Sequence, residues 1–190
     1  MANKESEFLK GAKSPKESRE WFRDTMKGMT PEKFQKDAGP FSRMENLSNN
    51  SIGRMYTFTY DAKWKDTLKY WDMYPLIFPI DFKTDSMLAI NLHYLHPSLR
   101  VKLLAALMET ANNNKLDKTT KLKINYGILK AASQYKPFKP CLKKYLFSHV
   151  RSPFINVSPS EWFYTILLPI ANFQKESEQT VWLQSALMIK

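Results

Sequence analysis

The sequence predicts an α+β fold in which a small central antiparallel sheet has helices on its N-terminal and C-terminal sides. Aromatic and β-branched residues alternate in the middle of the chain, which is typical of strands. Apolar residues recur at helical spacing before and after that region. The chain has 190 residues, of which 43% are hydrophobic, and this is enough for one packed domain. The pattern is compatible with either an open sheet or a barrel-like sheet.

The domain organisation follows from the same patterns. Residues 1–13 are polar and charged, and we expect them to form a flexible arm. Residues 14–190 are expected to fold as a single α+β domain. Within it, the sheet region is expected over about 54–92 and a helical, basic region over about 97–172.

Two similar four-residue signals mark the start of helices. Ser14 to Glu17 and Ser158 to Glu161 each combine a capping serine, a proline at the first helical position and a glutamate that completes a capping box. Gly28 is expected to end the first of these helices. A short helix should begin at Thr30, and the polar stretch 37–51 is typical of a loop.

Three strands are expected in the middle of the chain. In the first, 54–60, the side chains of Tyr56, Phe58 and Tyr60 should share one face. The second strand, 76–80, contains Pro79, which favours an edge position because proline cannot donate to a ladder. The third strand is expected over 87–92.

Helical spacing returns after the predicted sheet. Helices are expected over 97–112, 118–134 and about 140–150, and a further one after Ser158. Pro169 should kink or end this last helix. The apolar segment 181–189 is of uncertain type.

Positive charge is concentrated in one stretch. Between residues 115 and 151 there are ten basic residues and one acid, net +9, while the whole chain has a net charge of +11. A polyanion such as DNA is a natural partner for such a segment, and a solvated lysine-rich face is the alternative. Lysines make point contacts with phosphates, so DNA binding would be non-specific and salt-dependent. The candidate nucleic-acid-binding residues are Lys121, Lys123, Lys130, Lys136, Lys139, Lys143, Lys144 and Arg151.

Aromatic residues are the second candidate surface, because interfaces between proteins are enriched in them. Alternating rings on a strand can stack on bases, but they form the core face of a sheet more often. The candidate protein-interface residues are Trp21, Phe22, Tyr56, Phe58, Tyr60, Trp71, Trp162 and Trp182.

The sequence contains no recognisable set of catalytic residues. Asp81 and Lys83, with Asp72 upstream, resemble the end of a metal-dependent nuclease pattern, but the pattern is short and common by chance. His93 and His96 form one closely spaced pair, whereas zinc sites need three or four ligands. We therefore predict no enzyme activity, no cofactor and no metal.

The chain also lacks signals for the membrane or for secretion. No apolar run approaches the length of a membrane span, and the N-terminus has no hydrophobic signal region. The single Cys141 cannot form an internal disulfide, which is typical of proteins made in a reducing compartment. We therefore expect synthesis in the cytoplasm.

Two stretches of the sequence are distinctive. One is Glu17 to Asp24, and the other begins with Gly53 to Lys63 and continues through Thr67 to Ile77 and Asn91 to Leu95. Together they resemble a family of small virion-associated proteins of contractile-tailed phages. The resemblance covers roughly residues 14–108 and implies either a tail or baseplate component or a DNA-end protector. The family often has a glycine-rich turn before Asn91, where this chain has Thr84 to Ala89.

Three functions follow from these observations, in order of preference. The first is a non-enzymatic structural or assembly protein of a phage virion, in the tail, baseplate or neck, with other virion proteins as partners. The alternative is a basic protein that protects or coats phage genome ends through phosphate contacts. The third is a metal-dependent nuclease. The resemblance implies a location in the virion after synthesis in the host cytoplasm.

Overall fold

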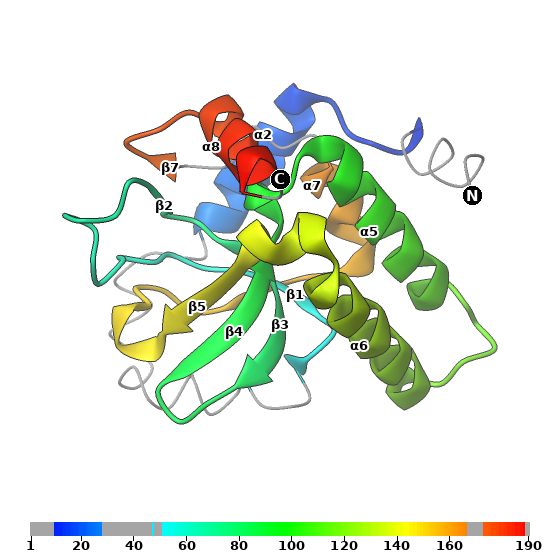
Figure 1. The fold of residues 1–190 in the computed structure, drawn as a ribbon. Coiled ribbons are helices and arrows are strands. Elements are labelled where there is room, and N and C mark those ends of the chain that lie inside the picture. Colours follow the sequence, from blue (N-terminus) through cyan, green and yellow to red (C-terminus); the bar gives the residue numbers. More distant parts are fainter. Residues whose placement is uncertain (1–9, 28–46, 48–50, 167–172, 189–190) are drawn as a thin grey trace.

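The computed structural model describes residues 10–27, 47, 51–166 and 173–188. Within this part of the chain the fold is α+β, as predicted, with a five-stranded antiparallel sheet flanked by helices (Figure 1). The strand order is β5-β4-β3-β1-β6, so β5 and β6 are the edges. The sheet is therefore open and is not closed into a barrel.

The sheet contains two strands beyond the three predicted ones. β1 is shorter than expected, but Tyr56 pairs with both Ile77 and Asn156, so β1 lies between β3 and β6. The five strands are β1 (Met55–Thr57), β3 (Leu76–Phe82), β4 (Ser86–Asn91), β5 (Leu142–Leu146) and β6 (Ile155–Val157). A separate two-stranded sheet joins β2 (Trp71–Asp72) to β7 (Phe173–Gln174).

The expected edge position of the strand that contains Pro79 is wrong, because β3 is the central strand. β1 pairs with β3 only at Leu76 and Ile77, so Pro79 lies beyond that ladder. On the other side, the pairing with β4 shifts register between Pro79 and Asp81. A proline is tolerated in a central strand at such an irregularity, because no ladder hydrogen bond from its nitrogen is needed there.

The helix expected over about 140–150 is also wrong. The segment forms a 3-10 turn, η3 (Lys136–Cys141), then strand β5 and a second turn, η4 (Phe147–His149). Pro137 and Pro140 disfavour an α-helix here, since proline lacks an N–H and restricts the residue before it. Every residue of β5 pairs with β4, so these non-local hydrogen bonds determine the conformation.

The other helices agree with the sequence. Asp117 caps α6 through its contact with the Thr120 nitrogen, and Glu161 closes a capping box with Ser158. The apolar C-terminal segment of uncertain type forms a helix. The helices are α2 (Pro15–Lys27), α5 (Pro97–Ala111), α6 (Lys118–Gln134), α7 (Trp162–Thr165) and α8 (Glu178–Leu187).

Some expectations fall outside the described residues. These are the short helix from Thr30, most of the loop 37–51, the kink at Pro169, and residues 1–9 of the arm. At the described end of the arm, the Lys13 nitrogen donates to the Phe163 carbonyl at 3.1 Å.

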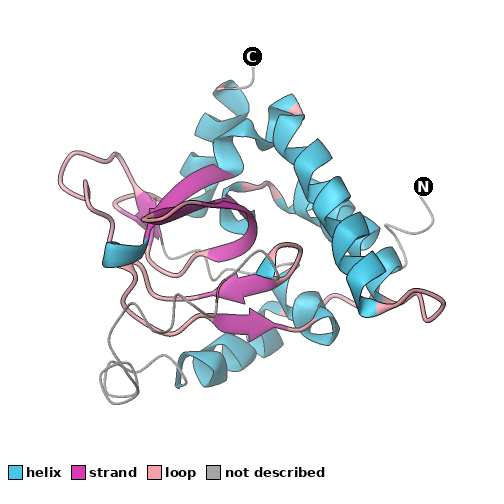
Figure 2. Cartoon of the chain, turned by 90° about the horizontal axis from the view of Figure 1, so that it is seen from below, coloured by secondary structure: helices cyan, strands magenta, loops and turns pink. Residues whose placement is uncertain are grey.

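Apolar side chains cover both faces of the sheet. The larger core lies between the sheet and the helices and contains Phe78, Leu104 and Trp162. The smaller core lies on the opposite face and contains Phe58 and Tyr145. Figure 2 shows the strands on one side of the molecule and the two long helices, α5 and α6, on the other. A surface cleft is lined by β5 and by Asp85, the residue that precedes β4.

Candidate nucleic-acid interface

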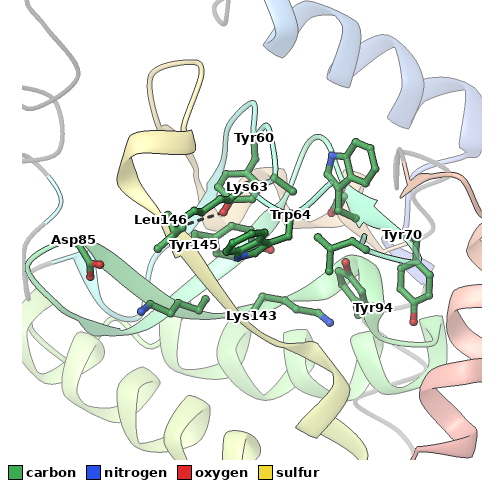
Figure 3. Close-up of a pocket in the computed structure, with 14 residues that line it drawn as sticks. Tyr60, Lys63, Trp64, Tyr70, Asp85, Tyr94, Lys143, Tyr145 and Leu146 are labelled. Carbon is green, nitrogen blue, oxygen red and sulfur yellow. Dashed lines mark hydrogen bonds between the residues drawn. The ribbon is translucent and has the colours of Figure 1, made fainter. Parts of the chain in front are cut away.

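A cleft of about 560 Å³ opens beside β5. One wall is the end of β5, and the opposite wall is the loop that joins Ala62 to Tyr70 (Figure 3). The lining residues are Tyr60, Ala62, Lys63, Trp64, Leu68, Tyr70, Trp71, Asp72, Asp85, Tyr94, Lys143, Lys144, Tyr145 and Leu146.

Aromatic rings form much of this lining. Trp64 is 62% exposed, which is high for the largest aromatic side chain. Tyr70 and Trp71 are half-buried, and Tyr70 packs against Tyr94 with ring centroids 6.0 Å apart. The cleft therefore presents ring faces to solvent, and flat ligands such as bases stack on such faces.

Three lysines supply positive charge to the same cleft. The Lys143 Nζ lies 3.8 Å from the centroid of the Tyr94 ring, a cation–π contact, and Figure 3 shows its side chain directed toward that ring. Burial lowers the pKa of Lys143, against the opposing attraction of Cys141 and Asp72. Lys63 and Lys144 are exposed at the rim. The cleft can thus attract an anionic group and hold it beside the rings.

A buried polar network forms the floor of the cleft. The Asp72 Oδ2 atom accepts hydrogen bonds from Asn91 Nδ2 at 2.8 Å and from His93 Nδ1 at 2.7 Å. Asn91 Nδ2 also donates to the Tyr145 hydroxyl at 2.9 Å. Burial raises the pKa of Tyr145 well above its usual value, with a further contribution from Tyr94. Tyr145 therefore stays neutral, and the network fixes β4, β5 and the β2 segment against one another.

One lysine holds the exposed loop in place. The Lys175 Nζ atom donates to the carbonyls of Lys65, Asp66 and Leu68, at 2.7, 3.4 and 3.1 Å. Lys175 itself has φ +77°, a backbone conformation that is uncommon for a lysine. These contacts connect the loop that carries Trp64 to the strand β7, more than 100 residues further along the chain.

The structure distributes the predicted basic residues over several elements. Lys143 and Lys144 line the cleft. Lys123 and Lys130 are exposed on α6, while Lys136 and Lys139 are exposed in η3.

The remaining two predicted DNA-binding residues, Lys121 and Arg151, have contacts within the chain. Lys121 Nζ donates to the Ala111 carbonyl at 2.8 Å, and Arg151 Nη1 donates to the Ser148 carbonyl at 2.8 Å. The predicted set therefore does not converge on one cleft.

The predicted interface aromatics are mostly internal. The expectation that Tyr56, Phe58, Tyr60 and Trp162 lie at a protein interface is wrong, because all four are buried in the two cores. Their burial confirms the alternative interpretation of the alternating strand as a core face.

The remaining four aromatics, Trp21, Phe22, Trp71 and Trp182, are half-buried. Trp21 Nε1 donates to Glu161 Oε1 at 3.0 Å, and Trp182 Nε1 donates to the His93 carbonyl at 2.8 Å. Both indoles therefore bridge elements of the fold, while Trp71 lines the cleft.

Sequence reasoning missed the residues that complete the cleft. Trp64, Tyr70 and Tyr94 were not singled out as a binding surface. The signal for Trp64 was its place between Lys63 and Lys65, since a tryptophan in a charged run has no apolar neighbours to bury it. Nothing local in the sequence indicates that Tyr94 lies beside Lys143.

The nuclease pattern is not assembled into a metal centre. Asp81 and Lys83 are exposed, whereas the Asp72 carboxylate is buried and bonded within the floor of the cleft. Across the described ranges, no three His, Cys, Asp or Glu side chains gather in a way that could hold a metal ion. Among the helices of this same part of the chain, none is long and apolar enough for a membrane crossing.

The cleft has the makeup of sites that hold nucleic-acid strands, which combine cations for phosphates with exposed rings for bases. The family model described as phage T4 terminal DNA protecting protein matches residues 3–185. The chain therefore belongs to this family of phage proteins. The match confirms the resemblance to phage virion-associated proteins and favours the DNA-end protector over the tail or baseplate component. Neither the curated proteins nor the solved structures compared with the chain gave a significant match.

Proposed function

We propose that this chain binds the ends of linear phage DNA and shields them, without carrying out a reaction on the DNA. The observation that carries the proposal is the family match, which spans nearly the whole chain and whose description refers to protection of terminal DNA. The net charge of +11 supports it, because a polyanion attracts such a protein over long distances.

The size of the cleft supports recognition of an end rather than of a duplex shaft. Its volume of about 560 Å³ lies within the range of small-ligand sites, ~300–1,000 Å³. Such a space accepts one end of a strand, whereas the shaft of a duplex is too wide for it. A closed circle offers no strand end, so the cleft would distinguish linear from circular DNA.

The residues of the cleft have distinct roles in this proposal. Lys63, Lys143 and Lys144 contact the terminal phosphates, and Trp64 and Tyr70 stack on the terminal bases. Lysine contacts and stacking depend little on base identity, so binding is independent of the terminal sequence. Protection follows because the bound end is covered by protein and is inaccessible to an exonuclease.

The chain is proposed to stay with the genome in the virion and to contact other virion proteins. The observation that supports such contacts is an apolar strip at the C-terminal end of α8, in which Leu183 is 64%, Leu187 57% and the capping residue Met188 73% exposed. Exposed apolar side chains grouped on one helix are typical of protein contacts. This strip replaces the buried tryptophan and tyrosines as the candidate protein interface.

An exonuclease protection assay tests the proposed function. Linear blunt-ended duplex is incubated with the protein and then digested with a double-strand exonuclease, and surviving full-length DNA is measured against protein concentration. We expect protection by the unmodified chain and loss of most protection in the double variant Lys63→Ala with Lys144→Ala, because both lysines are exposed at the rim of the cleft.

The matched control is the double variant Lys16→Ala with Lys102→Ala, which has the same net charge and changes two exposed lysines on α2 and α5. This control should protect DNA as well as the unmodified chain does. Equal loss of protection in both double variants would show that total charge alone matters and would refute the role of the cleft. Degradation of the DNA by the protein alone would show nuclease activity and would contradict the proposal that the chain carries out no reaction on DNA.

A further inference from the structure

Three lysines of the cleft have ammonium groups without a hydrogen-bond or ion-pair partner in the described part of the chain. The three are Lys63, Lys143 and Lys144. Other cations near the same loop are engaged, since Lys65 pairs with Asp61 at 3.0 Å and Lys175 donates to three loop carbonyls. The cleft therefore keeps positive charge that is not used in holding the fold together.

Lys143 is the most informative of the three, because its side chain is half-buried. Its Nζ atom lies 3.8 Å from the centroid of the Tyr94 ring, and no carboxylate of the described residues forms an ion pair with it. This atom is not among the fully buried polar atoms that lack a partner, so it remains accessible from the cleft that Lys143 lines. A partly buried ammonium is unfavourable unless an anion compensates for the lost hydration.

The two carboxylates of the cleft lie away from the accessible charge of this lysine. Asp72 is 1% exposed, and both of its oxygens accept hydrogen bonds within the floor. A hydrogen bond from Ser86, helped by the charge of Lys144, lowers the pKa of Asp85. Figure 3 shows Asp85 and Tyr94 at opposite ends of the cleft. An anion can therefore reach the end beside Tyr94 without meeting an exposed carboxylate.

A terminal phosphomonoester suits this arrangement better than a phosphodiester within a strand. A monoester carries a charge of roughly −1.5 to −2 at pH 7 and has three strongly accepting oxygens. Each internal diester carries a single negative charge. Three ammonium groups can each donate to one oxygen of the monoester, and such charge-assisted hydrogen bonds are stronger than neutral ones. Lysine also suits this role, because its ammonium is a compact point charge.

We propose that the cleft selects strand ends that carry a phosphate, with Lys143 as the main contact of that phosphate. This inference rests on the end binding proposed above and adds the chemistry of the end. Lys63 and Lys144, exposed at the rim, supply the remaining positive charge. A strand that ends in a hydroxyl meets the same rings but leaves Lys143 without a dianion, so it binds less tightly. The monoester can be at the 5′ end or at the 3′ end of a strand.

Fluorescence anisotropy with four duplexes of the same sequence and the same internal label tests this inference on the full chain. One duplex carries 5′-phosphates, one carries 3′-phosphates, one has only hydroxyl ends, and one is closed by a hairpin loop at each end. We expect at least one phosphorylated duplex to bind at least tenfold more tightly than the hydroxyl form. The hydroxyl form should in turn bind more tightly than the closed duplex. The phosphorylated form that binds more tightly identifies which strand end the cleft holds.

The variant Lys143→Met keeps an unbranched side chain over the Tyr94 ring and removes the charge. It should reduce the preference for phosphorylated over hydroxyl ends to less than threefold. The matched control Lys102→Met, at an exposed lysine on α5, removes one charge and should keep the tenfold preference. If Lys143→Met fails to fold, as judged by thermal melting, Lys144→Met replaces it and should reduce the preference in the same way.

The possible failures of this inference and of the proposed function give different results. Equal affinity for phosphorylated and hydroxyl ends, with both above the closed duplex, would overturn phosphate selection and leave end binding intact. Equal affinity for all four duplexes would overturn end binding and this inference with it. An equal preference in the Lys143→Met and Lys102→Met variants would overturn the role of Lys143.

Discussion

The basic segment 115–151 contains two regions with similar charge and different surroundings. On α6, Lys123 and Lys130 extend into solvent from a helix. On β5, Lys143 lies over the Tyr94 ring, and Lys144 lines the same aromatic cleft. Exposed lysines attract DNA from a distance, whereas lysines beside rings in a cleft can hold one particular part of it. A run of basic residues therefore indicates the class of partner, while the side chains around each lysine indicate where that partner binds.

The largest expected effect comes from the double variant Lys143→Ala with Lys144→Ala. Its affinity for DNA ends should fall on the order of a hundredfold, because each charge-assisted contact contributes ~1.5–3 kcal/mol. Fluorescence anisotropy with a short labelled duplex measures the change. The matched variant Lys123→Ala with Lys130→Ala has the same net charge and should lose roughly threefold, mainly through weaker long-range attraction. Similar losses in the two variants would remove the distinction between α6 and β5.

Removal of the exposed ring should have the next largest effect. Trp64→Ala should weaken end binding by roughly tenfold or more, because stacking of a base on an aromatic ring contributes ~1–3 kcal/mol. Trp64 is 62% exposed, so the melting temperature should not change. The same anisotropy titration tests this, with Trp64→Phe as the control that keeps a ring. If the alanine variant binds as tightly as the phenylalanine variant, stacking on this residue is not part of binding.

A smaller effect is expected at Lys175, which holds the loop of Trp64 without lining the cleft. Lys175→Met keeps the length of the side chain and removes the three carbonyl contacts. End affinity should fall roughly threefold, since a loop that must be ordered on binding costs ~0.5–1.5 kcal/mol per side chain. The distinguishing readout is the tryptophan fluorescence quenching by acrylamide, which should rise in Lys175→Met. An unchanged quenching constant would contradict the positioning role.

The smallest effect concerns pH. Because burial lowers the pKa of Lys143, rising pH removes its charge before that of the exposed lysines. End affinity in the unmodified chain should therefore begin to fall at a lower pH than in Lys143→Arg, where the guanidinium stays charged. Titrations across the alkaline range measure the two midpoints. Coincident midpoints would show that the protonation of Lys143 does not affect binding.

Local patterns predicted much of the fold. Helical spacing placed α6 at Lys118–Gln134, and capping residues such as Ser158 were found with their expected hydrogen bonds. Two elements were mispredicted because non-local pairing decided them. β5 forms along β4 in a segment with two prolines, and Pro79 occupies a central strand at a register shift. Single-sequence patterns contain no information on such partners.

The site was only partly predictable for the same reason. Net charge indicated the segment that carries Lys143 and Lys144, but the rings that complete the cleft come from 60–72 and from Tyr94. These residues are brought together by the buried network around Asp72, which joins β4, β5 and β2, and by the contacts of Lys175 with the loop of Trp64. The alternation of Tyr56, Phe58 and Tyr60 was a correct signal for burial, and of these three rings Tyr60 also lines the cleft.

Recognition of DNA ends is tested by comparing linear DNA with covalently closed circular DNA of the same length and sequence. Binding to both is measured at a single salt concentration, because phosphate contacts vary steeply with salt. We predict saturable binding to the linear form at its two ends and at least tenfold weaker binding to the circle. Equal affinity for the two forms would contradict recognition of DNA ends by this protein.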